Sequence, residues 1–111
     1  MEKNFDYDDV SDSLFISRKQ SGEIVQGSAE IGNLILDFTN NGKIVNVEFQ
    51  NISKFLGMMN LDYKILNELE EANLIVQQHR GAVSLFAVLK TPTLNQSIPL
   101  ATIPVQLASS V

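Results

Sequence analysis

The sequence of 111 residues contains no cysteine. Disulfide bonds, thiolate catalysis and zinc sites with cysteine ligands are therefore excluded. The sequence also lacks any apolar run near the ~20 residues that cross a bilayer. Its first residues, Met1 to Asn4, have neither the basic flank nor the apolar segment of a signal peptide. We expect a protein of the cytoplasm that has no contact with a membrane.

Basic residues are few. Eight lysines and arginines stand against 13 acids, the formal net charge is −5, and the basic residues form no run. Because binding to a phosphate backbone depends on clustered Lys and Arg, we expect no nucleic-acid partner. The only histidine is His79, and no second His or acid stands at ligand spacing from it. A lone His without such partners indicates neither a metal site nor an acid–base pair.

Residues 34–50 alternate between apolar and polar side chains around Asn41 and Gly42. Asn and Gly accept the positive backbone angles of tight hairpin turns, so the pattern predicts two antiparallel strands. The expected pairs are Phe38 with Val45, Leu36 with Val47, and Leu34 with Phe49. These six side chains share one face, because side chains alternate with period two. Asp37 and Glu48 then share the opposite face.

A second hairpin is predicted between residues 5–7 and residues 14–16. The expected pairs are Tyr7 with Leu14 and Phe5 with Ile16. The loop between them, residues 8–13, is rich in Asp and Ser, whose side chains bond to nearby backbone groups. A third strand is expected over residues 23–26, with a continuation to Ile31.

Four acids lie close together in this hairpin, namely Asp6, Asp8, Asp9 and Asp12. Calcium binds clustered carboxylates. The helix–loop–helix calcium loop, however, needs Gly at its sixth position and Glu at its twelfth. Counted from Asp6, those positions hold Ser11 and Ser17. The acids are therefore expected to solvate a turn, and no metal or cofactor site is predicted.

The pattern changes to helical spacing after Phe49. Asn51 is expected to cap a short helical turn that ends at Gly57. A longer helix is predicted over residues 60–73, because one apolar stripe is formed by Leu61, Ile65, Leu66, Leu69 and Ala72. The polar side of that helix contains Glu68, Glu70 and Glu71. A solvated helix face is the expected role of these three glutamates, since nothing nearby indicates a perturbed catalytic site.

Residues 74–105 are predicted to form a carboxy-terminal β extension. Two of its strands meet at Arg80-Gly81, with the pairs His79–Ala82, Val76–Leu85 and Ile75–Phe86. The run Leu85–Leu89 is apolar on both faces, so its second face requires another layer or a second subunit. Pro99 and Pro104 have opposite parity in the last segment. That segment must therefore be bulged, interrupted, or an arm that docks elsewhere.

Together these patterns predict an α+β fold. Antiparallel β-hairpins pack with one longer and one short helix, in a single domain over residues 1–111. The apolar fraction of 44% and the charged fraction of 19% are ordinary for a globular protein.

Several short segments carry a family resemblance. They are Leu34-Ile35-Leu36-Asp37, Gly42-Lys43-Ile44-Val45, Asn51-Ile52-Ser53-Lys54, Phe5-Asp6-Tyr7-Asp8 and Asp12-Ser13-Leu14-Phe15-Ile16. In these segments the chain resembles the "domain of unknown function 2283" family of small prokaryotic proteins, from Phe5 to Phe55. It departs from that family's pattern at Asp9-Val10-Ser11 in the first turn and at Asn46, where the family often has Gly. The family has no established activity, but some members are encoded beside small toxin-like proteins, which implies a partner-binding or neutralising role.

Three classes of function stay open. The first, which we expect, is a protein-binding or self-associating accessory module, such as a homodimer, with residues 83–89 and the proline-containing segment as its contact surface. The second is an antitoxin-like partner of a small toxin, because the acidic balance suits a small basic protein. The third is an enzyme that would use Asp6, Asp37, Glu48 or His79. Two acids on one face permit acid–base chemistry, but an exposed polar sheet face is the ordinary outcome, and no catalytic residue is assigned.

Overall fold

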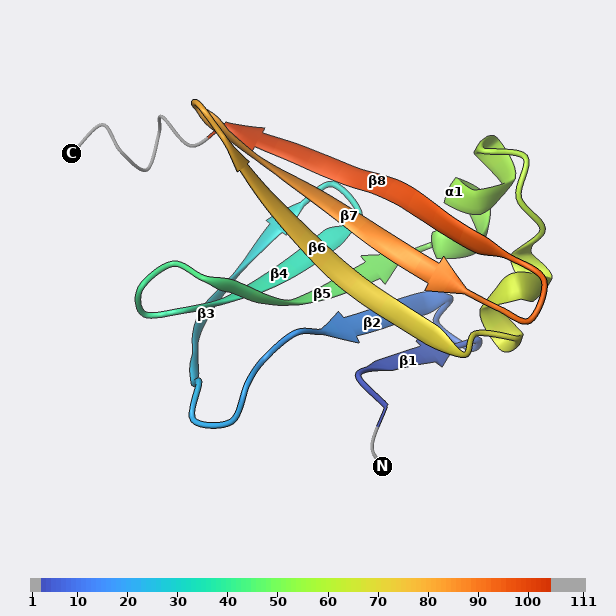
Figure 1. The fold of residues 1–111 in the computed structure, drawn as a ribbon, viewed down its shortest axis with the longest axis horizontal. Coiled ribbons are helices and arrows are strands. Elements are labelled where there is room, and N and C mark those ends of the chain that lie inside the picture. The colour runs from blue at the N-terminus through green and yellow to red at the C-terminus, as the bar shows by residue number, and fades with distance from the viewer. Residues whose placement is uncertain (1–2, 105–111) are drawn as a thin grey trace.

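The computed structural model describes residues 3–104. These residues form two antiparallel sheets, one α-helix and one 3-10 helix, which confirms the predicted α+β class (Figure 1). The elements in chain order are β1 (Phe5–Asp8), β2 (Ser13–Ser17), β3 (Val25–Ile31), β4 (Leu34–Thr39), β5 (Ile44–Gln50), α1 (Ile52–Met58), η1 (Tyr63–Asn67), β6 (Glu71–His79), β7 (Ala82–Lys90) and β8 (Asn95–Pro104). The first sheet has the order β1-β2-β5-β4-β3 and the second has the order β6-β7-β8.

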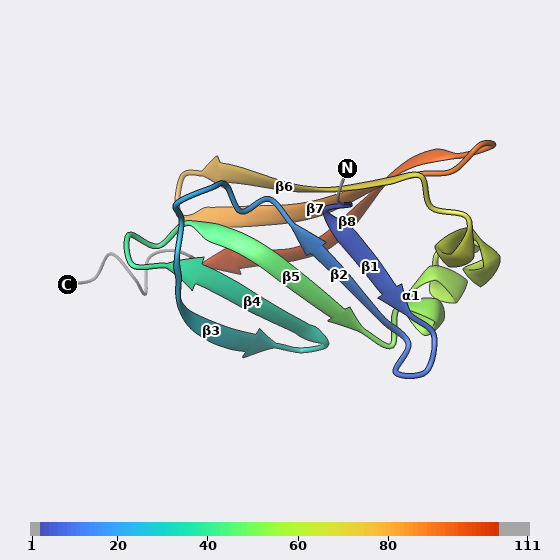
Figure 2. The same ribbon diagram turned by 90° about the horizontal axis from the view of Figure 1, so that it is seen from below.

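The two sheets lie face to face as layers, and α1 with η1 lies at one end of them (Figure 2). Their facing sides bury one hydrophobic core. The five-stranded sheet contributes Leu14, Ile16, Leu34, Leu36, Val47 and Phe49, and the three-stranded sheet contributes Ala72, Leu74, Leu85, Ala87, Leu89 and Ile98. At the end of the two sheets where α1 lies, its residues Ile52 and Leu56 complete the core. Each sheet therefore has one face against the core and one face turned outward.

The amino-terminal hairpin has the predicted register. Tyr7 lies opposite Leu14, and Phe5 lies opposite Ile16. The β6–β7 hairpin also has the predicted pairs, with Val76 opposite Leu85. In both hairpins the period-two pattern alone sets which residues meet.

The central hairpin agrees with the prediction at two of its three pairs. Leu36 lies opposite Val47 and Leu34 opposite Phe49, but Phe38 lies opposite Ile44 instead of Val45. The reason is the turn. It is a three-residue loop closed between Thr39 and Lys43, with φ of 83° at Gly42, so the pairing next to the loop moves by one residue. A bulge at Val45 then restores the predicted register.

The longer helix predicted over residues 60–73 is wrong. A 3-10 helix forms instead at Tyr63–Asn67, where the Asp62 side chain accepts a hydrogen bond from the Lys64 N–H. The chain is already extended at Glu71, which pairs with Lys90. Three residues of the predicted apolar stripe are buried, namely Leu66, Leu69 and Ala72. Ala72, however, belongs to β6, all nine residues of which pair with β7. That long-range ladder outweighs the local helical spacing, which is only a weak preference.

The last strand accommodates both prolines through a bulge. Phe86 lies opposite Pro99 while Leu85 lies opposite Ala101, so Leu100 is the extra residue. Because the bulge changes the parity, Pro99 and Pro104 both fit on an edge strand. The prediction of a bulged segment, one of three alternatives, is confirmed. Val105, the last residue of the predicted extension, lies outside the described residues.

Candidate functional site

Asp12 joins the loop of the first hairpin to the start of α1. Its carboxylate accepts hydrogen bonds from the Ser53 hydroxyl (2.7 Å), the Ser53 backbone N–H (3.2 Å) and the Tyr7 hydroxyl (2.8 Å). Asn51, the predicted cap, adopts a left-handed conformation and its side chain makes no capping bond. The α1 cap therefore comes from a residue far earlier in the chain. Asp12 is a structural residue and is not available to solvate the turn.

The same cluster shifts two pKa values. Burial raises the pKa of the Asp12 carboxyl, but hydrogen bonds from Ser53 and Tyr7 and the positive charge of Lys54 outweigh that effect, so the pKa lies below its usual value. Burial also raises the pKa of the Tyr7 hydroxyl, and the hydrogen bond to Asp12 and nearby carboxylates raise it further, to about 12. Tyr7 thus stays a neutral donor.

The short helix ends differently from the prediction. Gly57 lies inside α1, whose last residue is Met58. Asn60, with φ of 60°, takes the left-handed position instead, and the Leu61 N–H returns to the Leu56 carbonyl (2.8 Å). After Gly, Asn is the residue found most often in this conformation at the end of a helix.

Of the four residues considered for catalysis, Asp6 and Glu48 line one cavity, and Asp37 and His79 lie outside it. Asp37 and Glu48 share the outward face of the first sheet, as the register predicted. Both Asp37 oxygens, however, accept hydrogen bonds from neutral groups, the Ser28 hydroxyl (2.6 Å) and the Asn46 amide (3.0 Å). His79 ends β6 in the other sheet and is exposed. Among residues 3–104, no three His, Asp or Glu side chains are grouped so that they could hold a metal ion.

Asp6 and Glu48 do meet at an open cavity of about 470 Å³ on the outward face of the first sheet. The cavity is lined by Asp6, Asp8, Ser11, Ser13, Phe15, Glu48, Gln50 and Asn51. None of these residues is basic, and three are acids. Phe15 is 37% exposed, so its apolar ring is accessible at the cavity. The cavity therefore combines an aromatic surface with a negative field.

The cavity is one end of a row of side chains that crosses the whole sheet. Asp6 of β1 lies opposite Phe15 of β2, which lies opposite Glu48 of β5. Glu48 lies opposite Ile35 of β4, which lies opposite Glu30 of β3. We call these five residues the acidic row. Acids alternate with apolar residues along it, on a face where Figures 1 and 2 show no described helix or strand.

The acidic row was not predicted from the sequence as a unit. Only Asp6 and Glu48 were considered. Phe15 falls within the predicted strand of residues 14–16, but β2 pairs with β5 across a long separation that no local pattern reveals. The one available signal was the outward parity of Phe15 and Ile35, two large apolar residues on the polar side of their strands.

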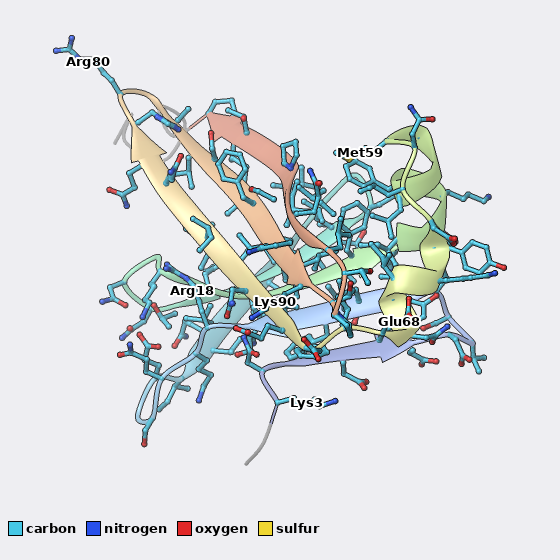
Figure 3. All side chains as sticks on the ribbon, turned by 45° about the vertical axis from the view of Figure 1, so that its right-hand side comes forward. Lys3, Arg18, Met59, Glu68, Arg80 and Lys90 are labelled. Carbon is cyan, nitrogen blue, oxygen red and sulfur yellow. The ribbon has the colours of Figure 1, made fainter. Side chains whose placement is uncertain are left out.

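A second uncovered surface lies on the outward face of β6, β7 and β8. Ile75, Phe86 and Pro99 face one another across the three strands, and Val88 follows on the same side of β7. We call these four residues the outer apolar face. Ile75 is 38% exposed, and Phe86 and Val88 are half-buried. At one end of this face Lys90 forms an ion pair with Glu71 (3.2 Å), whereas Arg80 projects from the turn at the other end (Figure 3).

No described helix is long and apolar enough to cross a membrane. No curated protein and no solved structure matches the chain. A family model, DUF2283, described as "Protein of unknown function", matches residues 4–53. The matched segment contains the first sheet, Asp12 and Ser53, and therefore the α1 cap and the whole acidic row. The match agrees with the resemblance seen in the sequence: residues 4–53, a little under half of the chain, are similar to the DUF2283 family of proteins of unknown function.

Proposed function

We propose that this protein is a protein-binding accessory module that self-associates through its outer apolar face. The observation that carries the proposal is an outward sheet face on which Ile75 is exposed and Phe86 and Val88 are only half-buried. A central strand with apolar side chains on both sides is ordinarily covered on both sides. Contact with a protein surface would remove this apolar area from water.

Charge favours a second copy as the occupant of this face. Glu71, the acid at one end of this face, is paired with Lys90, so two copies can approach without a repulsive excess of one sign. The acidic row behaves in the opposite way, since two copies of that surface would bring like charges together. Self-association is therefore expected at the outer apolar face and not at the acidic row.

Light scattering and sedimentation velocity over a concentration series test the proposal. We expect a dimer at tens of micromolar and its loss in Ile75→Lys, which places a charge on the contact. Met58→Lys is the matched control, because Met58 is 78% exposed on α1, away from this face. A monomeric wild-type protein throughout the series, or equal dissociation of both variants, would overturn the proposal.

A second function is favoured by the acidic row, namely an antitoxin-like role in which this protein binds a small basic protein. Among residues 3–104 the ion pairs are Lys43–Glu23 and Lys90–Glu71, so the acids of the row have no cation partner within this part of the chain. Co-purification from the native host tests this role. A small basic protein in stoichiometric amount is the expected result, and its absence from gently prepared extracts would count against it.

A further inference from the structure

We infer that the acidic row binds an amphipathic basic helix of a partner protein, with the helix lying across the strands. This inference rests on the second function proposed above and specifies the structure of the partner. The acids of the row stand on β1, β5 and β3, which are alternate strands of the sheet. Neighbouring strands are about 4.8 Å apart, so successive acids repeat at about 9.6 Å along the row.

The spacing distinguishes a helix from a strand. On an α-helix, residues i and i+7 lie on one side and are about 10.5 Å apart along the axis. On an extended partner, side chains of one face repeat at about 6.6 Å, and every second one at about 13 Å. Only the helical repeat is close to 9.6 Å. Basic residues at i, i+7 and i+14 would therefore meet Asp6, Glu48 and Glu30 in turn.

The apolar members of the row fit the same helix. Phe15 and Ile35 stand midway between successive acids. Residues i+3 and i+4 of a helix lie midway between i and i+7 on the same side, so apolar residues at those positions would contact Phe15 and Ile35. A lysine or arginine of the helix would also lie over the exposed Phe15 ring, which lines the cavity with Asp6 and Glu48.

Binding of synthetic peptides to the full chain tests the inference by fluorescence anisotropy. The first peptide is a helix former with Lys at i, i+7 and i+14 and Leu at i+3, i+4, i+10 and i+11. The second has the same composition with the lysines distributed around the helix. We expect the first to bind roughly tenfold or more tightly than the second, with affinity that falls as salt increases.

Variants of the protein locate the contact. Glu48→Gln removes the central charge and keeps the shape of the side chain, and Glu30→Gln does so at an exposed edge where the fold is not at risk. Each variant is expected to lower the affinity for the first peptide by roughly three- to tenfold. Glu68→Gln, an exposed glutamate outside the row, is the matched control and is expected to leave the affinity unchanged.

The outcomes separate the two proposals. If both peptides bind with equal affinity and Glu48→Gln weakens the binding of both, the inference of a helical partner is overturned. The proposal that the acidic row binds a basic partner then still holds. An affinity that neither Glu48→Gln nor Glu30→Gln reduces would overturn the assignment of the row. Absence of binding by either peptide at low salt would overturn both the helical partner and binding of basic proteins by this surface.

Discussion

The Asp12 carboxylate accepts a hydrogen bond from the Ser53 hydroxyl at 2.7 Å, across 41 positions of the chain. This contact fastens the β1–β2 loop to the first turn of α1. The backbone repeats the link, because the Ile52 N–H donates to the Asp12 carbonyl (3.2 Å). One residue thus holds the loop that borders the acidic cavity against the helix that closes the core.

Replacing Asp12 tests this role. Asp12→Asn keeps a side chain that tolerates the left-handed backbone, where φ is 55°, but loses the charge; we expect a loss of about 1 kcal/mol in the free energy of unfolding. Asp12→Ala also removes the cap and adds backbone strain, so we expect a loss of about 2–4 kcal/mol in urea unfolding. Asp9→Asn, in the same loop, is the control. Equal stability of all three variants would contradict the assigned role.

Acid should weaken the same link. The pKa of Asp12 is lower in the folded protein than in the unfolded chain, so its contribution is fully present above the unfolded value of 3.8. The contribution is lost as the pH falls through the lower, folded pKa. We therefore expect the difference in stability between wild type and Asp12→Asn to shrink below pH 3.8, as measured by urea unfolding at a series of pH values. A constant difference would contradict the ionised cap.

Alkali should act through Tyr7. Its pKa is raised from 10.0 to about 12, so the folded state favours the neutral phenol while the unfolded chain ionises first. The stability that Tyr7 contributes is present below pH 10.0 and is lost as the pH rises toward 12. Phenolate absorbance should show a late titration that is missing in Tyr7→Phe. If the titration curves of the two proteins differ only near pH 10.0, the hydrogen bond to Asp12 is not present in solution.

Two glycines should respond in opposite ways to alanine. Gly42 has φ of 83° at the end of the central loop, so Gly42→Ala is expected to cost about 1–2 kcal/mol. Gly57 lies within α1 and a Cβ there meets nothing within 4 Å, so Gly57→Ala is expected to stabilise the protein by about 0.5–1 kcal/mol. Thermal unfolding of both variants checks the pair. A stabilising Gly42→Ala would contradict the three-residue loop.

The two faces of β6 and β7 should differ in their sensitivity to truncation. Leu85 is completely buried between the sheets, so Leu85→Ala is expected to lower the free energy of unfolding by about 2–5 kcal/mol. Ile75 is on the outer face and 38% exposed, so Ile75→Ala should cost less than about 1 kcal/mol in dilute, monomeric protein. Urea unfolding at low protein concentration makes the comparison. A similar loss in both variants would place Ile75 against another part of the chain.

Local patterns in the sequence were enough to predict the hairpins, apart from the pair next to the central loop, and to show that the last strand could not be regular. Alternation of side chains has a period of two, so it sets the register of two strands that a short loop connects, as for Leu36 with Val47 and Tyr7 with Leu14. The two prolines of β8 are equally local evidence: each lacks the N–H of a ladder bond and their opposite parity excludes a regular edge strand, whereas the choice of a bulge among the three alternatives came from the structure. These features depend only on neighbours in the chain.

The start of β6, the cap of α1 and the acidic row depend on contacts that appear only in the folded protein. The helical stripe of residues 60–73 is broken because Glu71 pairs with Lys90, and the α1 cap comes from Asp12 instead of Asn51. The acidic row exists because β2 pairs with β5, which places Phe15 beside Glu48. These contacts join residues that are far apart in the chain. Their formation depends on which faces the core buries, and no local pattern contains that information.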